Sequence, residues 1–229
     1  MANEIRQFLH DHGISEVEAI IPDMAGIARG KIMPAAKFAE DEGMRLPESI
    51  FLQTVTGDWP VDADIAMSPT EMDIVLKADP KTVRRVPWAA EPTAQVIHDC
   101  FYADGRPVGM APRGVLRKIM ELYAERGWDP IVAPELEFYL VEPNLDADYP
   151  LKPPVGRSGR PESGRQSYSI AAVNEFDPLF DDMYQFCEDQ DIEIDTLIHE
   201  DGAAQMEINL LHGNALELAD QAFLFKRTA

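Results

Sequence analysis

Basic residues and cysteines are scarce in this sequence. Its 229 residues include 20 Lys and Arg against 41 Asp and Glu, which gives a formal net charge of -21. Phosphate backbones and anionic lipids attract basic surfaces, so this charge argues against nucleic acid or an anionic membrane as a partner and favours cation binding. The two cysteines, Cys100 and Cys187, lie far apart and lack the spacing of a metal site. Two core thiols in a reducing cytoplasm are therefore expected.

Long apolar segments are also missing. The sequence has no run of about 18 apolar residues, and Met1 is not followed by a basic and then apolar leader. Neither a membrane span nor a secretory signal is therefore expected. The hydrophobic fraction of 45% and the charged fraction of 27% are ordinary for a globular protein. The length allows one large or two modest domains with apolar cores.

Turn residues and apolar periodicity suggest how the chain is organised. In residues 1–95, a turn near Gly26 should return a strand at 17–21 as a second strand, and this predicts a small mixed sheet carrying a helix. A strand is expected at 94–100. Helices are expected from Pro112 to about 126, from Asp177 to about 188, and at 215–227 after a cap at Asn214.

The stretch 132–140 has the alternation of a strand with one apolar face. Successive side chains point to opposite faces, so Glu135 and Glu137 should lie side by side on the polar face, roughly 7 Å apart at Cα. Two carboxylates this close repel unless a proton or a cation intervenes, and oxygen ligands suit Mg²⁺ or Mn²⁺. The alternative is a half-exposed strand with two solvated glutamates.

A second acidic stretch, 192–212, is typical of a strand, an Asp-Gly turn and another strand. It would place Glu207 on a polar face and Glu200 at the mouth of the turn. If this hairpin neighbours the strand at 132–140, Glu135, Glu137, Glu200 and Glu207 converge. A bound divalent metal would relieve their repulsion, which suggests phosphoryl transfer from a nucleotide. No Walker-type or GxGxxG loop is present, so metals and arginines would hold the nucleotide.

The polar loop at 146–166 carries three arginines interleaved with three glycines in an otherwise acidic chain. A loop of about 20 residues in a compact domain is usually functional or disordered. Glycine lets backbone N-H groups approach an anion and arginine binds phosphate or carboxylate in a bidentate manner. The alternative is a surface loop whose arginines pair with nearby acids.

The order of several motifs resembles the glutamine synthetase family. They are a turn with a basic end and the glutamate-bearing segments that follow it: Asp23, Gly26, Arg29, Gly30, Lys31 and Pro34; Pro134, Glu135, Glu137 and Phe138; His199, Glu200, Gln205 and Glu207. The loop at 154–166, with 174–178 and 196–202, is similar to the γ-glutamylputrescine synthetase branch. The resemblance implies an α+β protein: an N-terminal β-grasp domain (1–95) followed by the first half of a glutamine synthetase-like catalytic domain (96–229).

The same resemblance implies the reaction and the roles of the candidate residues. Glu137, Glu200 and Glu207 would hold one Mg²⁺ or Mn²⁺ ion and Glu135 would contribute to a second. Asp195 and His212 would border the nucleotide. ATP would phosphorylate the γ-carboxylate of glutamate, and an amine such as putrescine would then attack the acyl phosphate and expel phosphate. A cytoplasmic ring-shaped homo-oligomer in nitrogen or polyamine metabolism is implied.

Two features depart from the family pattern. Where true glutamine synthetases carry Asp-Gly-Ser-Ser at the ammonium site, this chain has the segment 54–59, and a Tyr-Phe pair is replaced by Ser167 and Tyr168. These changes would give room for an amine larger than ammonia, with Asp58 pairing to its ammonium group. The chain is also much shorter than the family's, and lacks a Gly-Ser-Gly loop and later ligands. The 229 residues alone are therefore expected not to catalyse.

Three alternatives stay open. The first is an ammonia-using glutamine synthetase, which amine preference would distinguish. The second is a non-catalytic relative that keeps the fold as a binding or oligomeric module, against which the presence of all four glutamates argues. The third is an α+β metal-binding domain without a nucleotide.

Overall fold

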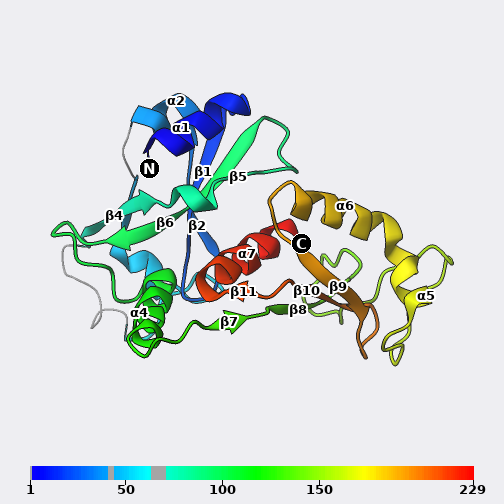
Figure 1. Ribbon diagram of the computed structural model, residues 1–229. Coiled ribbons are helices and arrows are strands. Elements are labelled where there is room, and N and C mark those ends of the chain that lie inside the picture. The colour runs from blue at the N-terminus through cyan, green and yellow to red at the C-terminus, as the bar shows by residue number, and fades with distance from the viewer. Residues whose placement is uncertain (1, 41–43, 63–70) are drawn as a thin grey trace. The chain divides into compact units, whose positions relative to one another are not determined.

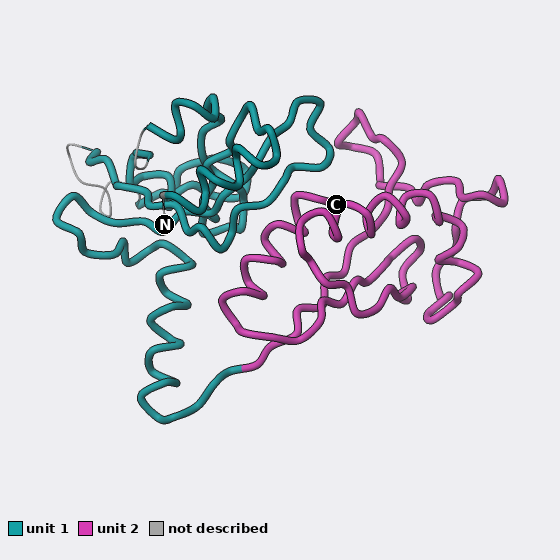
Figure 2. Tube along the Cα trace, turned by 45° about the horizontal axis from the view of Figure 1, so that its top comes forward, with its two compact units in different colours: residues 1–130 teal, residues 131–229 magenta. Residues whose placement is uncertain are grey.

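The computed structural model describes residues 2–40, 44–62 and 71–229. It contains two compact units, Met1–Pro130 and Ile131–Ala229 (Figure 2). Each unit combines helices with a sheet, so the architecture is mixed α/β, as expected. None of the described helices is long and apolar enough to cross a membrane.

The N-terminal unit is built on a six-stranded mixed sheet with the strand order β2-β1-β6-β4-β3 and a short β5 beside β6 (Figure 1). Its strands are β1 (Glu16–Pro22), β2 (Ala28–Pro34), β3 (Met44–Pro47), β4 (Asp73–Ala78), β5 (Arg84–Arg85) and β6 (Thr93–Phe101). β1 and β6 are parallel, and the other pairs are antiparallel. The assignment of this unit as a β-grasp domain stays a prediction.

Two N-terminal helices bury their apolar sides with this sheet. Ile5 and Leu9 of α1 (Ala2–Asp11) and Phe38 of α2 (Ala35–Glu40) belong to one buried cluster with Val17 and Ile21 of β1. Two short 3-10 helices, η1 (Glu48–Leu52) and η2 (Pro80–Thr82), complete the connections. The predicted small mixed sheet is therefore present, and helices accompany it as expected.

A buried aspartate closes the turn between β1 and β2. One oxygen of Asp23 accepts hydrogen bonds from the main-chain N-H groups of Ala25 and Ile27, and the other accepts from Arg29 Nε, each at 2.8 Å. Gly26 has a φ of 70°, which favours glycine. The turn predicted from Gly26 is confirmed, because β2 pairs with β1 over its full length.

β6 crosses the boundary that the sequence predicts between residues 95 and 96. This strand lies between β1 and β4 in the sheet, and α4 (Pro112–Ala124) follows it within the same compact unit. The contacts divide the chain after Pro130 instead. The boundary after residue 95 stays a prediction about domains, distinct from this division into compact units.

Arg113 joins α4 to the sheet through two aspartates. Its Nη1 lies 2.6 Å from Asp99 of β6 and its Nη2 lies 2.6 Å from Asp79, while its side chain is only 5% exposed. Arg117, one turn later, approaches both aspartates at 3.0 Å and is 41% exposed. Burial opposes ionisation of Asp79, but hydrogen bonds from Arg113 and the Lys81 main chain outweigh it and lower the pKa of Asp79.

The C-terminal unit contains a three-stranded antiparallel sheet, in the order β8-β10-β9, and a separate short pair, β7 with β11 (Figure 1). Its strands are β7 (Ile131–Val132), β8 (Glu135–Tyr139), β9 (Ile194–His199), β10 (Gln205–Leu210) and β11 (Gly213–Asn214). The helices are α5 (Ile170–Val173), the 3-10 turn η3 (Asn174–Phe176), α6 (Asp177–Glu188) and α7 (Ala215–Thr228). The expected helices at 177–188 and 215–227 are confirmed.

The single strand expected at 132–140 is wrong in one respect. The structure has two strands there, because β7 pairs with β11 whereas β8 pairs with β10. Pro134 lies at the break, where it cannot donate a ladder hydrogen bond, and its carbonyl accepts from Leu210 N at 3.0 Å. The alternation from Glu135 to Tyr139 is present as expected.

One face of the three-stranded sheet is apolar and packs into the core of the unit. Met206, Ile208 and Leu210 of β10 are almost fully buried, and Phe138 of β8 packs against Phe225 of α7 with ring centroids 6.4 Å apart. The opposite face of the same strands is therefore the one available for polar chemistry.

The Arg113 network gives a stability prediction. We expect Arg113→Met to lower the free energy of unfolding at pH 7 by about 3 kcal/mol, because buried carboxylates would lose their main partner. The control Arg117→Met should cost about 1 kcal/mol or less, because it is far more exposed. Urea unfolding measures both, and equal losses would contradict the ranking. Because the pKa of Asp79 is lowered in the folded state, its ionisation stabilises the fold above the ordinary pKa of 3.8. This stabilisation is lost in more acidic solution, so the difference in unfolding free energy between Arg113→Met and the unmodified chain should shrink there.

Candidate metal centre

The two glutamate-bearing segments are hydrogen-bonded neighbours, as the sequence analysis required. In the antiparallel pair of β8 and β10, Glu137 lies directly opposite Glu207 and Glu135 lies opposite Asn209. Directly opposed residues point to the same face of a sheet. The carboxylates of Glu137 and Glu207 therefore meet on the polar face, with the apolar core behind them.

The turn between β9 and β10 adds Glu200 to this pair. The N-H of Glu200 donates to the carbonyl of Gln205 at 2.8 Å, which continues the ladder by one position beyond β9. One carboxylate oxygen from each of Glu137, Glu200 and Glu207 lies within 4.8 Å of the others. We call these three residues the carboxylate cluster.

The cluster is electrostatically crowded. Burial raises the pKa of Glu200 above its ordinary value, and the charges of Glu207 and Glu137 and a hydrogen bond with Glu207 raise it further. Glu207 is buried, Glu200 is half-buried and Glu137 is exposed. Within the described part of the chain, no Lys, Arg or His side chain forms an ion pair with any of them.

The donor set fits a hard divalent cation. Oxygens that share a Mg²⁺ ion at about 2.1 Å lie roughly 3 to 4 Å apart, and the oxygens of the cluster lie within 4.8 Å of one another. The three ligand groups are all carboxylates, the type that suits Mg²⁺ and Mn²⁺. A cation would also supply the positive charge that neighbouring side chains do not.

A glutamine orients one member of the cluster. The amide oxygen of Gln205 accepts from Gly202 N at 2.9 Å and from the Tyr139 hydroxyl at 3.0 Å. Its amide nitrogen must then face the other way, and it donates to Glu137 Oε2 at 2.7 Å. A Cβ at Gly202 would lie 2.5 Å from the Tyr139 hydroxyl oxygen, so a larger residue here would displace that hydroxyl and its hydrogen bond to Gln205.

The other predicted site residues lie outside the cluster. Glu135 shares the polar face of β8, two pairs further along the ladder. Asp195 is exposed in a β-bulge, since Ile194 and Thr196 pair with successive residues of β10. His212 is exposed after β10. Asp58 belongs to the N-terminal unit, in a loop where it accepts from Thr56 Oγ1 at 2.8 Å.

The arginine-containing loop is partly tied down by acids. Arg157 Nη1 lies 3.5 Å from Asp177, and Ser158 N donates to Glu175 at 2.6 Å. Sequence reasoning missed another contact of this loop, in which Glu162 meets the ring of His199. No periodic pattern could have revealed it, because the two residues lie 37 positions apart and Glu162 is outside any regular element.

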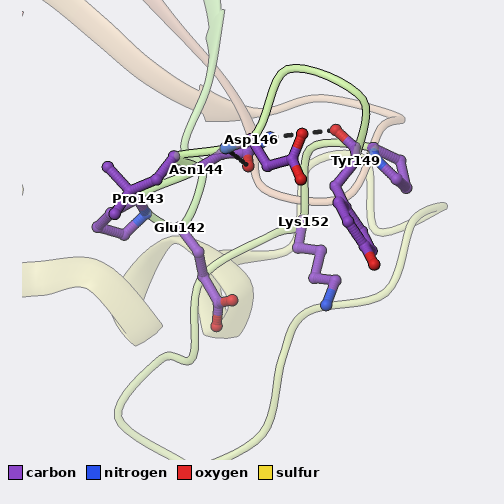
Figure 3. Close-up of a pocket in the computed structure, with 8 residues that line it drawn as sticks. Glu142, Pro143, Asn144, Asp146, Tyr149 and Lys152 are labelled. Atoms are coloured by element: carbon purple, nitrogen blue, oxygen red, sulfur yellow. Dashed lines mark hydrogen bonds between the residues drawn. The ribbon is translucent and has the colours of Figure 1, made fainter.

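A hollow elsewhere in this unit has no part in the cluster. It measures about 340 Å³ and is lined by residues of a single loop, 142–152 (Figure 3). Hydrogen bonds within the loop shape it, including one from Asn144 Nδ2 to the carbonyl of Tyr149 at 3.1 Å.

This chain is similar to known proteins in both sequence and structure. A family model described as the glutamine synthetase catalytic domain matches residues 109–229. A γ-glutamylputrescine synthetase of Escherichia coli is 31% identical over 98% of this chain and 48% of its own length. A glutamate–isopropylamine ligase of a Pseudomonas species is 28% identical over 97% of this chain and 49% of its own.

Solved structures have the same fold. A structure of GmaS without ligand superposes with a TM-score of 0.75 at 23% identity, covering 98% of this chain and 48% of that one. A crystal structure described as a novel glutamine synthase homologue gives a TM-score of 0.74 at 24% identity, covering 94% and 47%. The chain therefore spans about half the length of the relatives it matches.

The crowding predicts opposite effects of one substitution on stability and on cation binding. We expect Glu207→Gln to stabilise the cation-free chain by about 0.5 kcal/mol, because opposed like charges on neighbouring strands are destabilising. The same change should weaken Mn²⁺ binding at least about tenfold, because it removes a charged ligand. Urea unfolding with a chelator and electron paramagnetic resonance of free Mn²⁺ measure the two. Glu142→Gln, outside the cluster, is the control, and unchanged Mn²⁺ affinity in Glu207→Gln would rule out the metal centre.

Proposed function

Since the glutamine synthetase family model matches more than half of it, this chain belongs to that family, and we propose that it forms part of an ATP-dependent ligase. The proposed reaction joins the γ-carboxylate of glutamate to an amine. The observation that carries this proposal is the carboxylate cluster, which β8, β10 and the turn before β10 hold on one face of the sheet. The curated relatives include ligases that use amines as well as glutamine synthetases.

The reaction is proposed in two steps. The γ-carboxylate oxygen of glutamate attacks the terminal phosphorus of ATP, which gives ADP and γ-glutamyl phosphate. The amine nitrogen then attacks the acyl carbon, the bond to the phosphate oxygen breaks, and inorganic phosphate leaves as the amide forms. When bound, a divalent cation neutralises charge on the transferring phosphoryl group.

This chain would supply the cation ligands. Glu137, Glu200 and Glu207 would hold one Mg²⁺ or Mn²⁺ ion, and their oxygens are already close together. Glu135 is proposed to contribute to a second ion. Asp195 and His212 are proposed to lie on the nucleotide side, and both are exposed.

A larger amine than ammonia is the proposed acceptor. Asp58 is exposed, and the hydrogen bond that its carboxylate accepts from Thr56 leaves acceptor capacity for an ammonium group. The relatives named above act on putrescine and isopropylamine according to their names. We also propose that the protein forms a ring-shaped homo-oligomer, lies in the cytoplasm and has a role in polyamine or nitrogen metabolism.

An ammonia-using glutamine synthetase is the second candidate. A glutamine synthetase of Pyrococcus abyssi is 29% identical over 92% of this chain, which is close to the identity of the amine ligases. Amine preference separates the two candidates.

The amine prediction is tested on the protein encoded by the complete reading frame. With Mg²⁺, ATP and glutamate, we expect phosphate release to depend on added amine and to be faster with putrescine than with ammonia. Asp58→Asn should raise the KM for putrescine about tenfold and leave the rate with ammonia unchanged, because only the diamine would use that carboxylate. Phosphate release that needs no glutamate would exclude the ligase, and equal turnover of the two amines would favour the ammonia enzyme.

The isolated chain of 229 residues gives a separate prediction. We expect it to release no phosphate from ATP in a glutamate-dependent manner under the same conditions, because the relatives it matches are about twice as long. The assay contains only the chain, ATP, glutamate, the amine and Mg²⁺. Glutamate-dependent hydrolysis by this chain would show that the matched half is enough for the first step.

A further inference from the structure

The loop that follows β8 packs along the turn carrying Glu200. Tyr168 N donates to the carbonyl of His199 at 2.9 Å, and Arg165 N donates to that of Asp201 at 2.6 Å. Residues 162–168, here called the turn-backing segment, therefore run beside the end of β9. The segment is itself irregular, so its position depends on these contacts.

The ring of His199 is the link between this segment and the carboxylate cluster. His199 is fully buried, and its Nδ1 lies 2.6 Å from the main-chain carbonyl of Glu200. A carbonyl only accepts hydrogen bonds, so Nδ1 carries a hydrogen. Nε2 on the other side of the ring contacts Glu162 Oε1. Glu162 thus fixes the ring, and the ring fixes the main chain at Glu200.

Burying the carboxylate of Glu162 costs free energy, which indicates that this residue has a role beyond packing. Its side chain is 5% exposed, and Oε2 has no hydrogen-bond partner among the described residues. Oε1 also accepts from Gln166 Nε2 at 3.2 Å. A buried carboxylate with one unpartnered oxygen costs free energy that an apolar residue of similar size would not.

We propose that Glu162 is a positioning residue for the metal centre, acting through His199 on Glu200. This inference rests on the proposed function, because it assumes that the carboxylate cluster binds a divalent cation. Residues that hold the ligands of a metal in place, without touching it, typically change its affinity by about 10- to 100-fold when removed. Glu162 would do this from a loop that the sequence leaves without regular structure.

The test compares Mn²⁺ affinity in variants of the 229-residue chain, measured by electron paramagnetic resonance of the free ion. Glu162→Ala should weaken binding by about 10- to 100-fold. Glu162→Gln should stay within about threefold of the unmodified chain, because the amide can donate to Nε2 while Nδ1 keeps its hydrogen bond to Glu200.

Glu175→Ala is the matched control. Glu175 anchors the same loop by accepting from Ser158 N at 2.6 Å, and among the described residues its side chain forms no hydrogen bond with the turn at Glu200. If Glu162 only anchored the loop, Glu162→Ala and Glu175→Ala would affect Mn²⁺ binding alike. We expect Glu175→Ala to keep the affinity of the unmodified chain.

Thermal unfolding with a chelator is recorded for each variant, and Glu162→Leu, which fills the buried space, replaces Glu162→Ala if the latter does not fold. A folded Glu162→Ala or Glu162→Leu chain that binds Mn²⁺ as tightly as the unmodified chain overturns this inference and leaves the proposed function intact. If the unmodified chain binds no Mn²⁺, both the inference and the metal centre fail. Loss of affinity in the apolar variant, with rescue by Glu162→Gln, supports the inference.

Discussion

The C-terminal unit depends on one constraint, which is the repulsion among three carboxylates on the polar face of a sheet whose other face is buried. The register of β8 on β10 sets Glu137 opposite Glu207, and the turn after β9 brings in Glu200. The apolar residues on the other face leave these strands little freedom to relax the contact. Burial raises the pKa of Glu200, and the neighbouring charges of Glu207 and Glu137 raise it further. This repulsion lowers the stability of the cation-free unit, and a cation that binds only to the folded state would raise that stability.

The acids of the carboxylate cluster and several buried or partly buried acids of the N-terminal unit have different neighbours. In the N-terminal unit, Asp23 accepts from Arg29, and Asp79 shares Arg113 with Asp99, so burial is compensated by a cation of the chain itself. There the net effect is a lowered pKa of Asp79. In the carboxylate cluster the neighbours are other acids, and the pKa of Glu200 moves upward. The same chemical group therefore holds the fold together in one unit and stays available for a cation in the other.

The sequence predicted the features that depend on local periodicity or on motifs. Alternation at Glu135 and Glu137 and the hairpin before Glu207 follow from a period of two, and the family resemblance is confirmed by the matched catalytic-domain model. The break at Pro134 and the place of β6 beside β1 depend on which distant strand pairs with which, and no local pattern encodes that. The contact of Glu162 with His199 was missed for the same reason. The roles of Glu135, Asp195, His212 and Asp58 stay predictions.

The acidity of the whole chain strengthens the argument for a cation bound at the carboxylate cluster. A net charge of -21 creates a negative field, but salt screens it beyond roughly 8 Å at physiological ionic strength, so it cannot by itself fix an ion at one place. Under the proposed function, the three oxygens within 4.8 Å of one another would do so, because they act at contact distance. Under the proposed function, both ATP and glutamate are anions that such a surface repels. A cation held by the carboxylate cluster would therefore favour the binding of both substrates, before any transfer of the phosphoryl group.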